Sequence, residues 1–306
     1  MKATQIQTYG GPETVTVTDI EPPMPAPGEV VISIKAAALN PLDLKIIAGY
    51  MQQVFPIDLP YTPGSDFSGI VQAVGEGVTE VNVGDRVFGR TAPTAGGALA
   101  EQVRLPATDV RRIPPEMSFE QAASLPTTYG TAKQALTDVA KLQHGERVLI
   151  HGGAGGVGTM AVQIAALAGA HIIATASERN HALVRELGAH EVLDYRLDDF
   201  TRLENIDVVL DTFGGETLEK SWSVLGPKGR IATLADFSIK ARDGHEGSAV
   251  FFSTATPYLA DAIAQFQRGK LQVITDAIFD LADARAALEK LATGHARGKI
   301  IVRIGG

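Results

Sequence analysis

The sequence contains no cysteine at all. This absence excludes disulfides, cysteine-ligated zinc, iron–sulfur clusters and a thiol nucleophile. Excess positive charge is also missing, because the 306 residues carry a formal net charge of -8. An acidic chain without a basic cluster is poorly suited to bind a polyanion. We therefore expect neither cysteine chemistry nor a nucleic-acid partner.

Long apolar runs are missing as well. The most apolar stretch, residues 160–176, is interrupted by Gln163 and His171 and is too short and too polar to span a bilayer. The first nine residues alternate and lack the apolar core of a signal peptide. We expect a cytoplasmic protein with no membrane partner. Its composition, 45% hydrophobic and 20% charged, is typical of a folded chain long enough for two domains.

The pattern of the sequence changes near residue 123. Before it, short alternating segments rich in Val and Ile, separated by Gly and Pro, predict half-buried antiparallel strands at 29–37, 69–74 and 85–88. After it, strands alternate with helices, which predicts a doubly wound parallel sheet covered by helices on both faces. The expected strands are 147–151, 171–176, 191–193, 206–211 and 229–234, and the expected helices are 128–141, 156–168 and 180–187.

The C-terminal part is predicted to contain helices at 258–268 and 282–293 and strands at 274–279 and 298–304. The last strand is more similar to the early β segments than to the parallel sheet. We therefore expect the tail to return to the first domain.

A glycine-rich motif follows the first strand of the second part. Residues 147–151 precede Gly152-Gly-Ala-Gly-Gly-Val-Gly158, within which Gly153, Gly155 and Gly158 match the dinucleotide fingerprint. One glycine allows the tight turn, one lets the backbone approach a pyrophosphate, and one lets the helix pack on the sheet. Since a buried strand precedes the motif and a helix follows it, we expect Gly153, Ala154, Gly155, Gly156, Val157 and Gly158 to bind a dinucleotide.

The choice between NAD and NADP is usually made at the end of the second strand. There the chain reads Ala174-Thr-Ala-Ser-Glu-Arg-Asn180. Ser177 at the strand tip with Arg179 nearby favours the 2′-phosphate of NADPH. Glu178 is the competing signal, because an acidic residue that bonds the ribose hydroxyls would favour NADH. We expect NADPH, with NADH as the alternative.

Several segments, in a fixed order, carry a resemblance that spans almost the whole chain. They are Ala36-Ala-Ala-Leu-Asn-Pro-Leu-Asp43, Pro63-Gly-Ser-Asp-Phe-Ser-Gly-Ile-Val71, Val83-Gly-Asp-Arg-Val-Phe-Gly89, Gly96-Gly-Ala-Leu-Ala-Glu101, Ser124-Leu-Pro-Thr-Thr-Tyr-Gly-Thr-Ala132, the glycine loop, Glu186-Leu-Gly-Ala-His-Glu-Val-Leu-Asp-Tyr195, Asp211-Thr-Phe-Gly-Gly215 and Gly298-Lys-Ile-Ile-Val302. The ordered set resembles the zinc-independent quinone oxidoreductases of the medium-chain dehydrogenase/reductase superfamily.

This resemblance implies a GroES-like β domain, residues 1–123 and 268–306, that holds the substrate. It also implies a Rossmann domain, residues 124–267, inserted within it, with the active site in the cleft and a homodimer as the usual assembly. Further cofactor contacts are expected after the later strands and near the cleft. These are Thr128, Tyr195, Thr212, Phe213, Gly214, Phe251, Phe252 and Lys299.

The sequence differs from zinc-dependent members of the wider superfamily at the positions of the zinc ligands. Zinc-dependent relatives place Cys at the position of Asn40, and His and Glu at those of Ser65 and Asp66, and they carry a four-cysteine loop. Catalytic zinc needs three good protein ligands, and the three residues of this chain do not form such a set. We therefore expect hydride transfer without zinc.

The expected reaction is reduction of a quinone or an α,β-unsaturated carbonyl by NADPH, with the protein supplying position and hydrogen-bond donors. By resemblance, Asn40 donates to the substrate oxygen, although it could be only a turn residue before Pro41. Asp43 tunes the site or caps the helix that begins near Leu44, and Tyr50 is a further donor. The alternatives are an enoyl-thioester reductase that relies on Tyr50, and a non-catalytic NADPH-binding redox sensor.

Overall fold

The computed structural model describes residues 1–305 of the chain. The chain divides into two compact units. The first contains residues 1–127, 254–268 and 273–305, and the second contains residues 128–253 and 269–272. Residues 124–127 and 254–267, which the resemblance placed in the second domain, group with the first unit, and residues 269–272, placed in the first domain, group with the second unit. Helix α7 (Thr256–Gln267) belongs to the first unit because it packs against strand β7 (Val110–Arg112).

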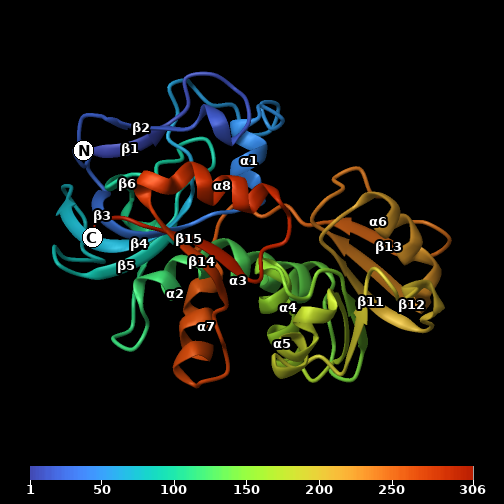
Figure 1. The fold of residues 1–306 in the computed structure, drawn as a ribbon. Helices are drawn as coiled ribbons and strands as arrows, with labels where there is room; N and C mark the ends of the chain where they lie inside the picture. Colours follow the sequence, from blue (N-terminus) through green and yellow to red (C-terminus); the bar gives the residue numbers. More distant parts are fainter. Residues whose placement is uncertain (306) are drawn as a thin grey trace. The chain divides into compact units, whose positions relative to one another are not determined.

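The first unit is built around a seven-stranded sheet in the order β14-β15-β3-β4-β5-β7, with β6 also paired to β3 (Figure 1). All its pairs are antiparallel except β14 with β15. Its strands are β3 (Glu29–Ala38), β4 (Asp66–Val74), β5 (Arg86–Arg90), β6 (Gln102–Pro106), β7, β14 (Thr275–Asp280) and β15 (Lys299–Arg303), and a small sheet pairs β1 (Lys2–Gln5) with β2 (Thr16–Asp19).

Three helices accompany α7 in this unit, namely α1 (Pro41–Ile47), α2 (Phe119–Ala123) and α8 (Ala284–Ala292). Strand β15 pairs antiparallel with β3, so the C-terminal tail does return to the first unit, as the sequence predicted. The early alternating segments are β3, β4 and β5, and β1, β2, β6 and β7 are further strands that the periodicity did not predict.

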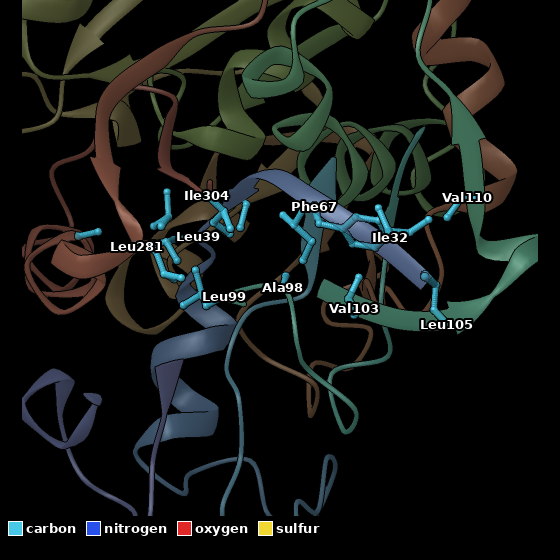
Figure 2. Close-up of a cluster of buried hydrophobic side chains, with 14 of the residues drawn as sticks. Ile32, Leu39, Phe67, Ala98, Leu99, Val103, Leu105, Val110, Leu281 and Ile304 are labelled. Atoms are coloured by element: carbon cyan, nitrogen blue, oxygen red, sulfur yellow. The ribbon is translucent and has the colours of Figure 1, made fainter. Parts of the chain in front are cut away.

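The core of the first unit lies between these sheets and their helices. Buried side chains from β3, β4, β6 and the C-terminal segment meet there (Figure 2). Ile32, Phe67 and Leu99 are fully buried. Each such side chain contributes roughly 1.5–3 kcal/mol by leaving water, so this core holds the elements that carry the polar residues described below.

The second unit contains a six-stranded sheet in the order β10-β9-β8-β11-β12-β13. Every pair in it is parallel, which confirms the predicted doubly wound sheet. Its strands are β8 (Arg147–Ile150), β9 (His171–Ala176), β10 (Glu191–Asp194), β11 (Ile206–Asp211), β12 (Leu225–Thr233) and β13 (Glu246–Ala249), and its helices are α4 (Gly156–Leu167), α5 (His181–Glu186) and α6 (Gly215–Ser221).

Two features of this unit differ from the sequence prediction. The helix expected at 128–141 is α3 (Leu125–Lys133) followed by a π-helical turn (Gln134–Val139). Strand β13 was not predicted, because its sequence Glu-Gly-Ser-Ala has no apolar alternation. It is the edge strand of the sheet, with a neighbouring strand on one side only. No helix of residues 1–305 is long and apolar enough to cross a membrane.

Candidate functional site

The strand order of the second unit reverses between β8 and β11. From β8 the chain adds β9 and β10 on one side, and from β11 it adds β12 and β13 on the other. In open parallel sheets the crevice outside the carboxyl ends of the strands at such a reversal is where ligands bind. The glycine loop follows β8, and residues 212–215 follow β11, so the structure brings two of the predicted cofactor segments to this edge.

The glycine loop fits the backbone of a dinucleotide for three separate reasons. Gly152 has φ +73 and therefore makes the tight turn. A Cβ on Gly153 would lie 2.9 Å from the Cβ of Ala174 on β9, so this glycine allows close packing against the next strand. A Cβ on Gly158 would lie 2.0 Å from the carbonyl oxygen of Gly152, so the helix packs directly on the loop. A Cβ on Gly155 would contact only that oxygen, at 3.4 Å, so the backbone here leaves space for a phosphate.

Helix α4 begins after Gly155, which is its N-cap. The N–H groups of Gly156, Val157 and Gly158 belong to the first turn, where no intrahelical acceptor precedes them. Those groups and the helix dipole favour an anion at this end. Ala154, in the same loop, is buried.

Asp211 fastens the loop after β11. Its carboxylate is fully buried and accepts from the N–H groups of Phe213 at 3.1 Å and Gly214 at 3.0 Å, and from the Thr233 hydroxyl at 2.6 Å. Thr212 in turn donates from its hydroxyl to the carbonyl of His151 at 2.9 Å. The loop is thereby tied to β8 and leaves the ring of Phe213 64% exposed.

His151 directly follows β8 and is buried inside the unit. Its Nε2 lies 3.1 Å from the Ser221 hydroxyl, which already donates to the Thr217 carbonyl at 2.7 Å. The Ser221 oxygen therefore accepts, and the Nε2 carries the hydrogen. Burial lowers the pKa of His151 to about 4, although nearby Asp211 raises it. Its lowered pKa and its contacts with the hydroxyls of Thr175 and Ser221 are those of a buried structural residue.

The loop after β9 contains the residues expected to choose the cofactor. Strand β9 ends at Ala176, so Ser177 is the first residue beyond it, and its side chain is buried. Ser177 accepts from the Asn180 amide at 3.1 Å. Glu178 and Arg179 are exposed. The strand end lies where the apolar pattern predicted it.

Asp194, at the end of β10, joins this loop to the next one. One oxygen of its buried carboxylate accepts from the N–H of Glu178 at 3.1 Å, and the other accepts from the N–H of Arg196 at 2.9 Å. The guanidinium carbon of Arg196 lies 5.3 Å from the ring centroid of Tyr195, which is half-exposed. The structure thus brings Tyr195 near the loop of Ser177 and Arg179.

Three further expected contacts lie elsewhere in this unit. Phe251 follows β13, is half-exposed and makes an edge contact with Phe237, with 6.0 Å between ring centroids. Phe252 is the next residue and is partly buried. Thr128 is buried within α3.

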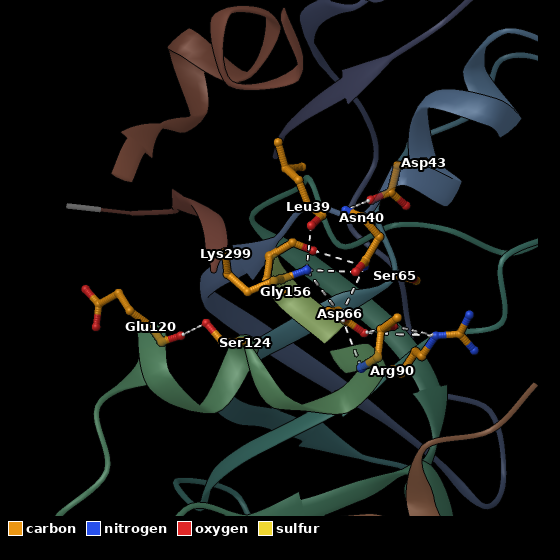
Figure 3. A network of polar contacts seen from close by, with 12 residues as sticks. Leu39, Asn40, Asp43, Ser65, Asp66, Arg90, Glu120, Ser124, Gly156 and Lys299 are labelled. Carbon is orange, nitrogen blue, oxygen red and sulfur yellow. Dashed lines mark hydrogen bonds and ion pairs between the residues drawn. The ribbon is translucent and has the colours of Figure 1, made fainter. Parts of the chain in front are cut away.

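The first unit holds a buried polar cluster, here called the lysine cluster, made of Asn40, Asp43, Asp66, Arg90, Thr127 and Lys299 (Figure 3). The Nζ of Lys299 lies 2.7 Å from Oδ1 of Asn40 and 4.0 Å from Oδ2 of Asp66. The Asn40 amide donates to the same Asp66 oxygen at 3.0 Å. Asn40, Asp66 and Lys299 are buried.

Asp66 also has partners on its other side. Its Oδ1 accepts from the Thr127 hydroxyl at 2.7 Å, and the Nε of Arg90 lies 4.0 Å away and donates to the same hydroxyl at 3.1 Å. The Asp66 carboxylate is therefore bracketed by two cations, Lys299 and Arg90. A buried charge needs such pairing to be retained.

Asp43 takes part in a helix cap and has a perturbed pKa. Its carboxylate accepts from the N–H of Asn40, the N-cap residue, at 2.7 Å in the capping box of α1. Asp43 is therefore the third residue of a helix that begins at Pro41, not the cap of a helix that begins near Leu44. Burial raises the pKa of Asp43 to about 7, against the lowering effect of the Asn40 hydrogen bond. Tyr50, by contrast, lies in the turn after α1 and is 82% exposed.

Two family models match the chain. One describes an alcohol dehydrogenase GroES-like domain and covers residues 26–115, and the other describes a zinc-binding dehydrogenase and covers residues 187–302. The chain is 32% identical to the quinone oxidoreductase of Homo sapiens over 324 residues, 99% of this chain and 97% of that protein.

Solved structures agree with this. The quinone oxidoreductase of Coxiella burnetii has a TM-score of 0.94 at 33% identity and covers 100% of this chain and 99% of that one. The Escherichia coli quinone oxidoreductase, solved in complex with NADPH, has a TM-score of 0.88 at 26% identity and covers 99% and 100%.

The chain belongs to the quinone oxidoreductase family of the medium-chain dehydrogenase/reductase superfamily. Its first unit is the GroES-like domain and its second is the Rossmann domain. It is an NAD(P)-dependent oxidoreductase that acts on a small molecule.

In this member of the family, Asn40, Ser65 and Asp66, the positions at which zinc-dependent relatives place ligands, do lie together. Ser65 is buried and adjoins Asp66 in the chain. Among residues 1–305, no group of three or more His, Cys, Asp or Glu side chains could hold a metal ion. The fourth group at this place is the ammonium of Lys299.

Sequence reasoning did not single out several residues that organise these sites. Arg90 and Thr127 reach Asp66 from sequence distances of 24 and 61 residues, which no local pattern shows. Asp194 and Asp211 each stand at the last position of a parallel strand. That position was the available signal, because a carboxylate there accepts from the N–H groups of the loop that follows.

Proposed function

We propose that this protein is an NADPH-dependent reductase of quinones or α,β-unsaturated carbonyls that works without zinc. The observation that carries the cofactor choice is the end of β9 at Ala176, with Ser177 next and two exposed cations near it. Arg179 follows on the same loop, and Arg196 is tied to that loop through Asp194. Two guanidinium groups suit a phosphate better than a ribose hydroxyl.

Glu178 is the residue that would favour NADH. Its backbone N–H is held by Asp194, and its side chain is exposed. Because Ser177, rather than Glu178, directly follows the strand, the serine is the better candidate to face the ribose. We therefore infer that the 2′-phosphate is accepted by Ser177, Arg179 and Arg196.

The proposal of a zinc-free reaction is supported by the donor set of the lysine cluster. Zinc sites in proteins use thiolate, imidazole and carboxylate ligands. Here an amide oxygen, a backbone carbonyl and one carboxylate surround the ammonium of Lys299, which repels a divalent cation. These residues do not fit zinc.

When bound, NADPH supplies the hydride, and the reduced oxygen of the substrate then requires hydrogen-bond donors and a proton. Asn40 is the proposed donor to that oxygen. Asp43 is the proposed proton store, because burial raises the pKa of its carboxyl to about 7. Both residues lie at the start of α1 and belong to the lysine cluster.

One observation favours a second candidate, an enoyl-thioester reductase. The phenol of Tyr50 is exposed and is therefore free to donate a proton to a substrate carbon. A Tyr50→Phe variant distinguishes the two functions, because only enoyl-thioester reduction should fall, by about tenfold or more.

The experiment that tests the proposal is a fluorescence titration of NADPH and NADH with wild type and Arg179→Ala, followed by turnover assays with a benzoquinone, an enal and an enoyl thioester. We expect NADPH to bind at least about tenfold more tightly than NADH, a difference of about 1.4 kcal/mol, and Arg179→Ala to reduce that difference. Equal affinities would assign the ribose to Glu178. Tight NADPH binding without any turnover would identify a redox sensor.

A further inference from the structure

Lys299 is unusual because a lysine ammonium is almost completely buried. It begins β15, and its N–H donates to the carbonyl of Ile274 at 2.9 Å. The preceding Gly298 has φ +78, and a Cβ there would lie 2.1 Å from that carbonyl oxygen. The glycine thus lets the chain enter the sheet at the angle that carries the lysine side chain inward.

The ammonium is surrounded by oxygen atoms. Its Nζ lies 2.5 Å from the carbonyl oxygen of Leu39, 2.7 Å from Oδ1 of Asn40 and 4.0 Å from Oδ2 of Asp66 (Figure 3). Burial lowers the pKa of Lys299, whereas Asp66 and Asp43 raise it. An ammonium has three donors and no acceptor, so the cage offers it two hydrogen bonds and one ion pair.

This cage determines which way the Asn40 amide points. Lys299 can only donate, and therefore the amide oxygen must face it. The carboxylate of Asp66 can only accept, and therefore the amide nitrogen must face that side, at 3.0 Å. The second N–H of Asn40 has only a long contact of 3.4 Å with the carbonyl of Ala38, which a better acceptor can replace.

We propose that Lys299 is a positioning residue that holds the Asn40 amide with one N–H directed to a substrate oxygen. Its ammonium fixes the amide oxygen, and Asp66 fixes the first N–H from the opposite side. The catalytic consequence rests on the proposed function, in which Asn40 donates to the substrate. The orientation itself rests only on the contacts within the first unit.

The competing role is charge neutralisation, in which Lys299 serves only to balance Asp66. Two variants separate these roles. Lys299→Met removes the cation and leaves Asp66 short of a partner, which should destabilise the protein because an incompletely paired buried carboxylate remains. Lys299→Met combined with Asp66→Asn removes both charges together and retains an amide beside Asn40.

We expect Lys299→Met to lower both the urea midpoint and kcat. In the double variant we expect the midpoint to recover most of its loss, while kcat stays at least tenfold below wild type with the KM for NADPH unchanged. Lys299→Arg, which keeps a donor toward Asn40, should restore part of kcat. Recovery of both the midpoint and kcat in the double variant would overturn the proposal.

A second readout does not depend on turnover. The side-chain NH₂ signals of Asn40, assigned by their loss in Asn40→Ser, should exchange slowly with solvent in wild type and at least tenfold faster in the double variant. Unchanged exchange would overturn the positioning role even if the protein is an active reductase. Slow exchange in wild type that is lost in the double variant would support it even if no quinone or enal is reduced.

Discussion

In the Rossmann domain, the groups expected to meet the cofactor are backbone N–H groups and exposed side chains at the edge of a sheet. In the GroES-like domain, the polar groups of the lysine cluster are buried and bonded to one another. The first arrangement needs open space beside glycine, as at Gly155. The second needs charge balance, as around Asp66. Substitutions should therefore impair the Rossmann domain by filling open space, and the GroES-like domain by unbalancing buried charges.

The largest effect is expected from a methyl group in the glycine loop. Gly158→Ala places a Cβ only 2.0 Å from the carbonyl oxygen of Gly152, and this backbone atom cannot move away without a change in the loop. The loop must shift, so NADPH affinity should fall about 100-fold, or by about 2.7 kcal/mol, in a fluorescence titration. The contacts within the lysine cluster should not change in this variant.

Gly155→Ala is the matched control in the same loop. Its Cβ would contact only the Gly152 carbonyl oxygen, at 3.4 Å, so the urea midpoint should stay at the wild-type value, while the affinity falls because the methyl group takes up the space left for the phosphate. A Gly158→Ala variant that binds NADPH as wild type does would show that the third glycine is not needed for packing.

The glycine loop could be predicted from the sequence because its function depends on neighbours in the chain. Gly152 to Gly158 supply the turn, the open backbone and the helix start within seven residues, and the strand ends at Ala176 and Asp211 follow from apolar runs. The residue with a positive φ is nevertheless Gly152 rather than Gly153, because the spacing of the glycines alone does not reveal φ.

The lysine cluster could be predicted only in part. Asn40 and Asp66 were recognised through the resemblance, and Asp43 through its place near a helix start. That Lys299 reaches Asn40 across 259 residues depends on the pairing of β15 with β3. Its expected role as a cofactor contact stays a prediction. Long-range pairing of this kind depends on tertiary packing, which local periodicity does not encode.

The two domains should also respond to pH in opposite directions. Asp43 has its pKa raised to about 7, so the native state binds its proton more tightly, and stability is lost as pH rises from about 4 to 7. His151 has its pKa lowered to about 4, so the unfolded state binds the proton more tightly, and stability is lost as pH falls from 6.5 to 4. The effect corresponds to about 4 kcal/mol for Asp43 and about 3 kcal/mol for His151.

Urea unfolding followed by the single tryptophan, Trp222, reports on the Rossmann domain, because that residue adjoins the Ser221 partner of His151. Its transition should weaken in acid, and His151→Gln should remove that loss. Hydrogen exchange of β3 amides reports on the GroES-like domain, whose stability should decline toward pH 7 in wild type and stay level in Asp43→Asn. The same pH slope in a variant and in wild type would mean that another group causes it.

The smallest expected effect concerns Arg196, which lies at the exposed edge where charge is screened by water. Arg196→Ala should lower NADPH affinity about three- to tenfold, or by roughly 1 kcal/mol, and leave NADH affinity unchanged, because only NADPH carries the 2′-phosphate. The loss should shrink at high salt. Arg202→Ala, an exposed arginine already paired with Asp199, is the control and should change neither affinity. An equal loss for both cofactors would place Arg196 against the part they share, and its stacking on Tyr195 would then matter more than its charge.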